Sequence, residues 1–361
     1  MICVSMTDLE IRAFDAWVLR EPVSRRAYTV VRLTAGGGLH GYGECSEVEG
    51  SEIAATRRVV LGRPATSYEA VRLALHETPH LGPAINAAML DLLGKATKAP
   101  VFQLLGGPTR NRVRVLASLH GATDDELVAS AAALHRAGFF ALGVPLPPVV
   151  ARNQGLAFMQ AVINRLDAVR TAVKDVDLVL EGSSALTPGD ALSLSSEIER
   201  FHLLWFDEPC PMSNLAAVRK ISDESVTPLG FGRKIEQPSE VQNGLREEVL
   251  DVLRPDLGRH GISQIRKMAA LAETYYIAVA PHHAGGPVGT AAALHLAASL
   301  PNFFIQNIPV PEAEADSRMR AELTGGSVEG AKDGFAALPT APGLGISVSD
   351  EALEKYKERV L

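Results

Sequence analysis

Five short apolar runs in the middle of the chain each end in a polar residue, at nearly regular intervals. The polar residues are Glu181, Asp207, Arg233, Asp256 and His282, and the steps between them are 26, 26, 23 and 26 residues. A strand of about five residues, a helix and two short loops need about that much chain, so the spacing predicts repeated βα units. If the strands are parallel and close into a barrel, the five side chains meet at one mouth, where such folds keep their chemistry. Arg233 is the exception, because it is a cation among three carboxylates and a histidine.

The same alternation extends over the whole region from residue 113 onward. Each predicted strand is followed by an Ala- and Leu-rich segment with helical periodicity. No G-x-G-x-x-G turn follows the first strand, which favours a barrel of parallel strands over an open nucleotide-binding sheet. The predicted strands are 113–118, 139–144, 177–181, 203–207, 227–232, 251–255, 276–280 and 303–307.

The two ends of the chain do not alternate in this way. Before about residue 110, β-rich runs at 9–20 and 27–34 precede helical patterns at 67–77 and 83–98. The tail contains a β-like run at 345–349 and a helical pattern over 350–360, and we expect it to pack back on the N-terminal part. The predicted organisation is an α+β domain at 1–110, a barrel at 111–320 and a C-terminal segment at 321–361.

Composition argues against several classes of function. The 361 residues carry a formal net charge of −7 and no basic cluster, which argues against a nucleic-acid-binding surface. No apolar stretch approaches the roughly 20 residues that span a bilayer, and the first residues lack the features of a signal peptide. The three scattered cysteines, Cys3, Cys45 and Cys210, suit a reducing compartment better than a disulfide framework. We therefore expect a cytoplasmic protein without a membrane or nucleic-acid partner.

Five stretches give the chain a resemblance to a known family, and they occur in that family's order. They are PAINAAMLDLLGKATKAPVFQLLGG at 83–107, LLWFDEP at 203–209, RPDLGRHGIS at 254–263, PHHAGGPVGTAAALHLAASLPNF at 281–303 and GLGISVSDEALEKY at 343–356. On these motifs the chain resembles the enolase superfamily, in its mandelate racemase / muconate lactonizing enzyme branch, over essentially its whole length. The resemblance implies an α/β fold, a modified (β/α)8 TIM-type barrel with an α+β capping domain built from the N-terminal segment and the C-terminal tail.

The chemistry that this resemblance implies is removal of a proton next to a carboxylate. A divalent ion, normally Mg²⁺, stabilises the resulting enediolate, and three carboxylates at the ends of successive barrel strands hold the ion. The matching positions are Glu181, Asp207 and Arg233. Glu181 and Asp207 are therefore the implied metal ligands. The guanidinium of Arg233 has only donors and stays protonated, so it argues against a bound metal.

A charge count suggests a different arrangement at these three positions. Three carboxylates with Mg²⁺ sum to −1, and so do Glu181, Asp207 and Arg233. We therefore expect Arg233 to form an internal ion pair with both carboxylates, in the place of the metal. The alternative is that Arg233 points elsewhere and Glu236 supplies the third ligand.

Other catalytic positions are partly kept. At the second barrel strand, relatives commonly carry one or two lysines, whereas this chain has Gly143 and Pro145, which cannot move a proton. Asp256 and His282 match the family's dyad, in which a carboxylate orients a histidine that takes the proton. At the eighth strand, Asn307 stands where many relatives have a glutamate, and we expect its amide to bind substrate.

The remaining features near the mouth have mainly structural interpretations. Glu44, in the motif GYGE, is expected near the domain interface, and the glycines of AGGPVG at 284–289 form either a backbone anion-binding turn or simply a tight turn. We expect His283 to be a loop or buried histidine and Trp205 to be a packing residue. By strand periodicity, Glu208 is expected to face away from the barrel interior.

The predicted function is abstraction of a proton alpha to the carboxylate of a small acid, such as a sugar acid. His282 with Asp256 would move the proton, and Arg233 would stand in for the metal. The outcome would be dehydration, racemisation or epimerisation, so the protein would be a lyase or an isomerase. The alternative is a catalytically silent barrel that binds a small acid. The resemblance also implies a homo-oligomer.

Overall fold

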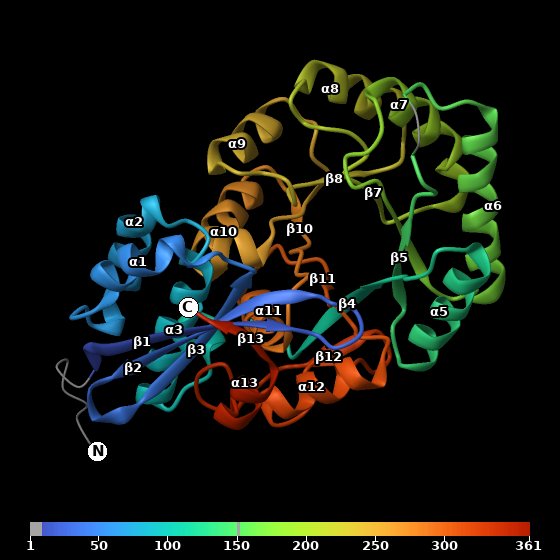
Figure 1. The fold of residues 1–361 in the computed structure, drawn as a ribbon. Helices are drawn as coiled ribbons and strands as arrows, with labels where there is room; N and C mark the ends of the chain where they lie inside the picture. The colour runs from blue at the N-terminus through green and yellow to red at the C-terminus, as the bar shows by residue number, and fades with distance from the viewer. Residues whose placement is uncertain (1–8, 150–151) are drawn as a thin grey trace.

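The computed structural model describes residues 9–149 and 152–361 and consists of a barrel and a smaller α+β domain packed against it (Figure 1). Cys3 and the first residues considered for a targeting signal lie outside the described part. Cys45 and Cys210 are buried free thiols. Among the described residues, no helix is both long and apolar enough to cross a bilayer.

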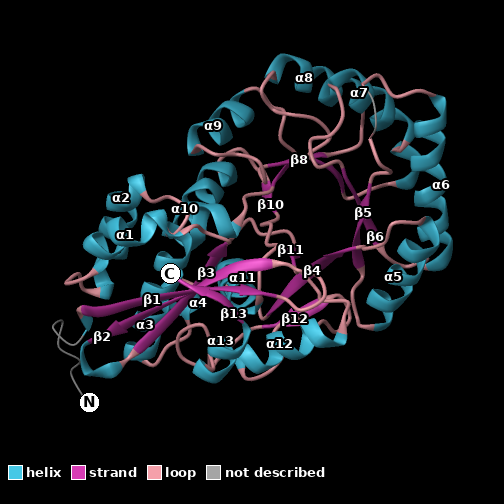
Figure 2. Ribbon diagram, viewed as in Figure 1, coloured by secondary structure: helices cyan, strands magenta, loops and turns pink. Residues whose placement is uncertain are grey.

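The barrel confirms the predicted fold class. Its parallel strands follow the order β10-β9-β8-β7-β6-β5-β4-β11. The ring closes where Val279 N–H donates to the Asn302 carbonyl at 2.9 Å and Phe304 N–H donates to the Val279 carbonyl at 2.8 Å. Each predicted strand overlaps one observed strand, and Figure 2 shows them as a ring inside a layer of helices. The strands are β4 (Arg112–Ser118), β5 (Ala141–Pro145), β6 (Asp177–Glu181), β7 (Trp205–Asp207), β8 (Leu229–Phe231), β9 (Val252–Leu253), β10 (Ala278–Val279) and β11 (Gln306–Asn307).

Several of the helices outside the ring begin at a residue whose side chain caps the helix. Thr123 and Glu126 form a capping box at the start of α5, and the side chain of Asp256 caps α10. The Ala-rich helix α11 is buried along its whole length, because it lies between the barrel and the smaller domain. These helices are α5 (Asp124–Arg136), α6 (Leu156–Ala172), α7 (Pro188–Glu197), α8 (Leu215–Glu224), α9 (Pro238–Arg246), α10 (Leu257–Glu273), α11 (Pro287–Ser299) and α12 (Glu314–Thr324).

The smaller domain is an antiparallel meander of β1, β2 and β3 covered by helices. Helix α3 lies so close to β3 that only glycine fits at two positions, since a Cβ on Gly43 would lie 1.9 Å from the Ala84 carbonyl oxygen and one on Gly41 would lie 2.2 Å from that of Ala88. The elements are β1 (Ile11–Arg20), β2 (Ala27–Ala35), β3 (His40–Ser46), α1 (Ile53–Val60), α2 (Tyr68–Ala74), α3 (Gly82–Thr97) and α4 (Val101–Leu104). Short 3-10 turns occur at Gly36–Gly38, Gly50–Glu52, Ala65–Ser67, Leu75–Glu77 and Glu199–Phe201.

The C-terminal tail reaches both parts of the molecule and corrects two predictions. β12 (Phe335–Ala337) pairs antiparallel with β4, whereas the predicted β-like run at 345–349 forms no strand. The helix predicted over 350–360 ends early, as α13 (Asp350–Tyr356), and β13 (Lys357–Val360) follows it. β13 pairs antiparallel with β1. The edge of β1 offers backbone hydrogen bonds to residues 357–360, and these outweigh the local helical pattern. Sequence periodicity does not reveal this pairing, because β1 is distant along the chain. The domain limits near 110 and 320 stay a prediction.

Candidate active site

The C-terminal ends of neighbouring barrel strands carry the polar residues predicted to meet at the mouth. Glu181 and Asp207 are the last residues of β6 and β7 and lie in register with each other. Arg233, Asp256 and His282 follow shortly after β8, β9 and β10, and a β-bridge joins Asp256 to His282. The strand order therefore places the five residues around the mouth in their order along the chain.

Asp207 is fully buried and accepts hydrogen bonds from three side chains. Arg233 donates through Nη1 to Oδ2 at 2.8 Å. Arg254 donates through Nε to Oδ1 at 2.8 Å and through Nη2 to Oδ2 at 3.5 Å. Trp205 Nε1 donates to Oδ1 at 2.9 Å. A carboxylate offers about four acceptor positions, so those of Asp207 are committed to the protein itself.

Arg254 is a member of this cluster that sequence reasoning missed. Its side chain has no exposed area, donates to the Ala280 carbonyl at 3.0 Å and stacks on Trp205, with Cζ 4.9 Å from the ring centroid. One signal was available, because Arg254 precedes Asp256 by two residues and strand periodicity places both on one side. Trp205 does pack in the core as expected, but its Nε1 also holds Asp207. The indole ring of Trp205 has room because Gly230 has no side chain, since a Cβ on Gly230 would lie only 2.3 Å from Trp205 Cδ1.

The two arginines determine the ionisation of this cluster. Complete burial opposes the charge on Asp207, but Arg254 and Arg233 outweigh it and lower the pKa of Asp207 to about 2. Burial also opposes the charge on Arg233, yet Asp207 and Glu181 raise the pKa of Arg233 above its ordinary value. Asp207 and Arg233 are therefore both ionised throughout the neutral pH range.

Glu181 has a different partner from the expected one. Its Oε1 accepts a hydrogen bond from Ser118 Oγ at 2.7 Å, and Ser118 is the last residue of β4. This contact crosses β5 at Gly143, where a Cβ would lie 2.5 Å from Glu181 Oε1. The expected ion pair of Arg233 thus forms with Asp207. No hydrogen bond or ion pair joins Glu181 to an arginine within the described part of the chain, and Arg233 acts on it only through longer-range attraction.

The site does not fit a hard divalent ion. Mg²⁺ requires a near-octahedral set of oxygen ligands, whereas nitrogen donors surround Asp207 and the guanidinium of Arg233 lies at the third ligand position. The predicted charge count omits Arg254, and with it the sum over Glu181, Asp207, Arg233 and Arg254 is 0 rather than −1. A divalent ion would therefore make the cluster positive.

Glu236, the alternative third ligand, lies away from the cluster. Its side chain is 75% exposed, and its Oε1 lies 3.9 Å from Arg259 Nη1. Within residues 9–149 and 152–361, no group of three Asp, Glu, His or Cys side chains is placed to hold a metal ion. The structure thus brings Arg233 to Asp207 and leaves Glu236 on the rim.

The predicted histidine–carboxylate pair is formed. His282 Nδ1 lies 2.6 Å from Asp256 Oδ2, and an ionised carboxylate only accepts, so Nδ1 carries the proton and Nε2 keeps its lone pair. The other oxygen of Asp256 accepts the Arg259 backbone N–H at 3.0 Å, which fixes the carboxylate to the start of α10. For His282 Nε2, the described residues provide no hydrogen-bond partner. The imidazole is therefore oriented at one nitrogen and free at the other.

Burial and charge together keep His282 neutral. Burial has the largest effect and lowers the pKa of His282, and the nearby charges of Arg233 and Arg254 add to it, against the hydrogen bond that His282 donates to Asp256, which raises the pKa. Burial also opposes ionisation of Asp256, but His282 holds the pKa of Asp256 below its ordinary value. At neutral pH the pair is a neutral imidazole beside a carboxylate, which is the state that a general base needs.

Glu208 fixes the loop that carries Arg233. Its Oε1 accepts the backbone N–H groups of Gly232 at 2.8 Å and Arg233 at 2.7 Å, and its Oε2 accepts Ser184 Oγ at 3.1 Å. Glu208 is buried and has a φ of 47°, so it departs from regular strand alternation, on which its expected orientation depended. The residue next to Asp207 therefore positions the backbone of Arg233.

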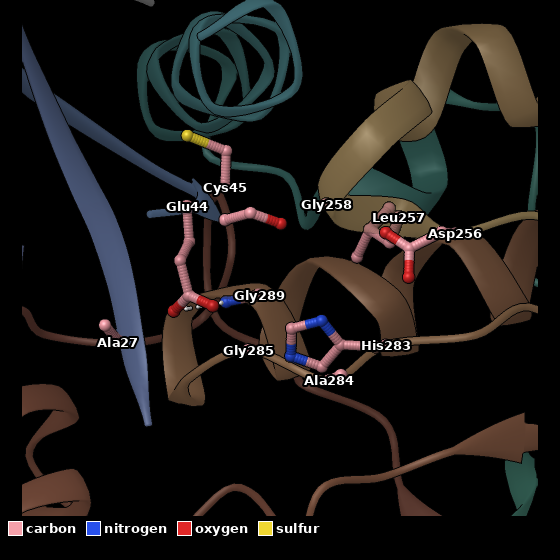
Figure 3. A pocket seen from close by; sticks show the side chains of 11 residues that line it. Ala27, Glu44, Cys45, Asp256, Leu257, Gly258, His283, Ala284, Gly285 and Gly289 are labelled. Carbon is pink, nitrogen blue, oxygen red and sulfur yellow. Dashed lines mark hydrogen bonds between the residues drawn. The ribbon is translucent and has the colours of Figure 1, made fainter. Parts of the chain in front are cut away.

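A cavity of about 70 Å³ lies between the capping domain and the barrel, beside Asp256 (Figure 3). Glu44 lines it and accepts the N–H groups of Gly286 and Gly289, the latter at 3.1 Å, so the glycine turn at 284–289 binds the carboxyl group of the chain's own Glu44. Burial raises the pKa of Glu44 to about 7. His283 is the expected buried histidine: its Nε2 donates to the Gly286 carbonyl at 3.0 Å, and burial lowers the pKa of His283 to about 4.

Asn307 ends β11, next to the strand that carries Ser118. It is 4% exposed, and its backbone N–H donates to the Pro281 carbonyl at 3.3 Å. Its side-chain amide has no hydrogen-bond partner among the described residues. The predicted substrate-binding residue therefore has free donor and acceptor capacity at the same end of the barrel.

Comparisons with known proteins agree with this architecture. Residues 10–106 match the mandelate racemase / muconate lactonizing enzyme N-terminal domain, and residues 126–352 match the enolase C-terminal domain-like family. A D-galactonate dehydratase family member from Streptomyces bingchenggensis is 28% identical over 91% of this chain and 89% of its own length. A D-xylonate dehydratase from Haloferax volcanii is 28% identical over 75% of this chain and 68% of its own. A solved mandelate racemase/muconate lactonizing enzyme-like protein from Roseovarius sp. TM1035 has a TM-score of 0.86 and 28% identity, covering 97% of this chain and 96% of that one. The chain therefore belongs to the enolase superfamily, in its mandelate racemase / muconate lactonizing enzyme branch.

Proposed function

We propose that the protein removes the proton next to the carboxylate of a sugar acid and then eliminates water from it. The observation that carries the proposal is the oriented His282–Asp256 pair, 2.6 Å apart at the barrel mouth, with Arg233 close by. Relatives named D-xylonate and D-galactonate dehydratases support the substrate class and the outcome. An isomerase reaction, racemisation or epimerisation, begins with the same proton transfer.

The reaction follows from the groups at the mouth. Neutral His282 takes the α-proton at Nε2, and the electron pair of the broken C–H bond moves into the carboxylate to give an enediolate. Asp256 stabilises the imidazolium that forms. When the enediolate collapses, the bond to the β-hydroxyl breaks and the imidazolium returns the proton to the leaving oxygen, which departs as water. The resulting enol becomes a 2-keto acid.

Arg233 supplies the stabilising charge in this altered metal site. Members of the superfamily generally use Mg²⁺, but here Asp207 is engaged by Arg233 and Arg254. Arg233 donates one hydrogen bond to Asp207 through Nη1. Its remaining N–H groups are left to bind the two oxygens of a substrate carboxylate. A guanidinium has half the charge of Mg²⁺, so we expect weaker stabilisation and slower turnover than in metal-dependent relatives.

A catalytically silent barrel that binds a small acid is the second candidate. The observation that favours it is the loss of several groups at once: Gly143 and Pro145 replace proton-moving side chains, Arg233 replaces a ligand, and Asn307 cannot deliver a proton. In that case the Asp256–His282 pair is a structural hydrogen bond.

Deuterium exchange at the α-carbon discriminates between the two functions. The protein is incubated in D₂O with xylonate, gluconate, galactonate and mannonate, with and without a chelator, and followed by NMR. We expect exchange or keto-acid formation with at least one acid, unchanged by the chelator, abolished by His282→Asn and retained by His80→Asn, an exposed control. Absence of exchange with every acid would favour the silent barrel. Loss of exchange on chelation would contradict the altered site.

A further inference from the structure

We infer that Glu181, together with Ser118, binds hydroxyl groups of the substrate on the wall of the barrel mouth opposite His282. The inference deepens the proposed function and rests on it for the placement of the substrate carboxylate. It assigns to Glu181 a role other than the metal-ligand role that the family resemblance implies.

The first observation is that Glu181 forms no hydrogen bond with Arg233 or Arg254, the two arginines that hold Asp207, within the described part of the chain. Asp207 takes the hydrogen bonds of both arginines, whereas Glu181 accepts one bond, from Ser118 Oγ to Oε1 at 2.7 Å. Its Oε2 has no hydrogen-bond partner among the described residues. Glu181 and Ser118 are both partly exposed, although the strands that they end are buried in their interiors. A carboxylate with an open acceptor therefore faces the mouth.

The second observation is how this orientation is maintained. Ser118 on β4 reaches Glu181 on β6 across β5, and the contact passes where Gly143 lacks a side chain. A Cβ at Gly143 would lie 2.5 Å from Glu181 Oε1 and 2.8 Å from Cδ. The position that carries a lysine in relatives is thus filled by the Glu181 carboxylate, which the Ser118 hydroxyl fixes in place.

The third observation is the order of strands around the barrel. β6 and β10 are separated by β7, β8 and β9 on one side and by β5, β4 and β11 on the other, so Glu181 lies across the mouth from His282. Arg233 follows β8, midway between them. An acid whose carboxylate binds Arg233 and whose α-carbon faces His282 extends its remaining carbons toward Glu181 and Ser118.

The chemistry of this wall selects for a particular substrate class. Glu181 Oε2 accepts hydrogen bonds, and Ser118 Oγ, whose proton is given to Glu181, also accepts. The wall therefore binds groups that donate, such as the hydroxyls of an aldonate. It repels a second carboxylate, so a sugar diacid should bind less well than the monoacid of equal length.

Calorimetric titration with gluconate, glucarate and hexanoate tests the inference without requiring turnover. For the wild-type protein we expect gluconate to bind at least about tenfold more tightly than hexanoate, which lacks hydroxyls, and more tightly than glucarate. Glu181→Gln should lower the affinity for gluconate about tenfold and leave the affinity for hexanoate unchanged. It should also reduce the preference for gluconate over glucarate. Gly143→Ala should reproduce the loss for gluconate, because the added methyl group displaces the carboxylate without removing its charge.

Two variants control for charge and folding. Glu236→Gln removes a carboxylate from the exposed rim and should change none of the three affinities. Ser118→Ala deletes only a hydroxyl group and should lower the affinity for gluconate but not that for hexanoate. If Glu181→Gln does not fold, the Ser118→Ala result tests the inference in its place. The inference is overturned if Glu181→Gln loses affinity for gluconate and hexanoate equally. It is also overturned if the wild-type protein does not bind gluconate more tightly than hexanoate and glucarate. Selective binding of gluconate without any α-carbon exchange leaves the inference standing and contradicts the proposed function.

Discussion

Arg254 Nε lies 2.8 Å from Asp207 Oδ1, and neither side chain has any exposed area. With the partly exposed Arg233 on the other oxygen, this buried pair occupies the acceptors of a carboxylate that would otherwise be free to bind an ion. The barrel mouth is therefore divided into an ionic cluster, at β7 to β9, and proton-transfer and acceptor groups on either side of it.

Replacing Arg254 should destabilise the fold more than replacing Arg233. Arg254→Met leaves the buried Asp207 carboxylate with half of its hydrogen bonds, and we expect the free energy of unfolding to fall by about 3–5 kcal/mol. Arg233 has a 21% exposed side chain, so in Arg233→Met water replaces part of the lost interaction and the loss should be smaller. Unfolding titrations with guanidinium chloride measure the free energy of unfolding of both variants. Equal losses would contradict the central position given to Arg254.

A carboxylate in place of Arg233 should create Mg²⁺ binding. Arg233→Glu gives three carboxylates at the ends of successive strands, so millimolar Mg²⁺ should raise the melting temperature of the variant but not of the wild-type protein. Arg259→Glu adds the same charge on the rim and is the matched control. Mg²⁺ stabilisation of the wild-type protein equal to that of Arg233→Glu would show that the native site accepts the ion.

The pH dependence of α-proton exchange should follow the neutral form of His282. Burial and the neighbouring arginines lower the pKa of His282 below its ordinary value of 6.5, so the base is protonated only in more acidic solution. The exchange rate should therefore rise with pH below 6.5 and level off before neutrality. Asp256→Asn should reduce the rate by about 100-fold or more, because the imidazole loses its orientation and the partner of its charged form. A rate that still rises above pH 7 would identify a different base.

Glu44 should make the protein less stable as pH rises from acidic to neutral. The free carboxyl ionises near pH 4.5, whereas burial raises the pKa of Glu44 to about 7 in the folded state. Between these values the unfolded chain ionises and the folded protein does not, which lowers the free energy of unfolding by about 3 kcal/mol in total. Glu44→Gln removes this contribution, so its stability relative to wild type should increase over that pH range. Denaturant titrations at several pH values measure the difference, and a constant difference would be the opposite result.

The sequence predicts most of the barrel because the signals there are local. Each strand is a short apolar run, each helix has its own periodicity, and the polar residue at the end of a run lies at the mouth once the strands are parallel. The Asp256–His282 pair is predictable for the same reason, since adjacent strands bring their ends together. The predicted helix over 350–360 fails after Tyr356, because β1 offers the last residues hydrogen bonds that are distant in sequence.

The amino-acid sequence is sufficient to predict the fold class, the order of polar residues around the mouth and the presence of a cation where the family resemblance implies a metal ligand. How those charges pair depends on the packing of the closed barrel. Asp207 binds the buried Arg254 as well as Arg233. Glu181 instead accepts a hydrogen bond from Ser118, in the space left by the missing side chain of Gly143. Such choices depend on side-chain reach and on competition among donors from different strands, and these are properties of the closed barrel rather than of any segment of the chain.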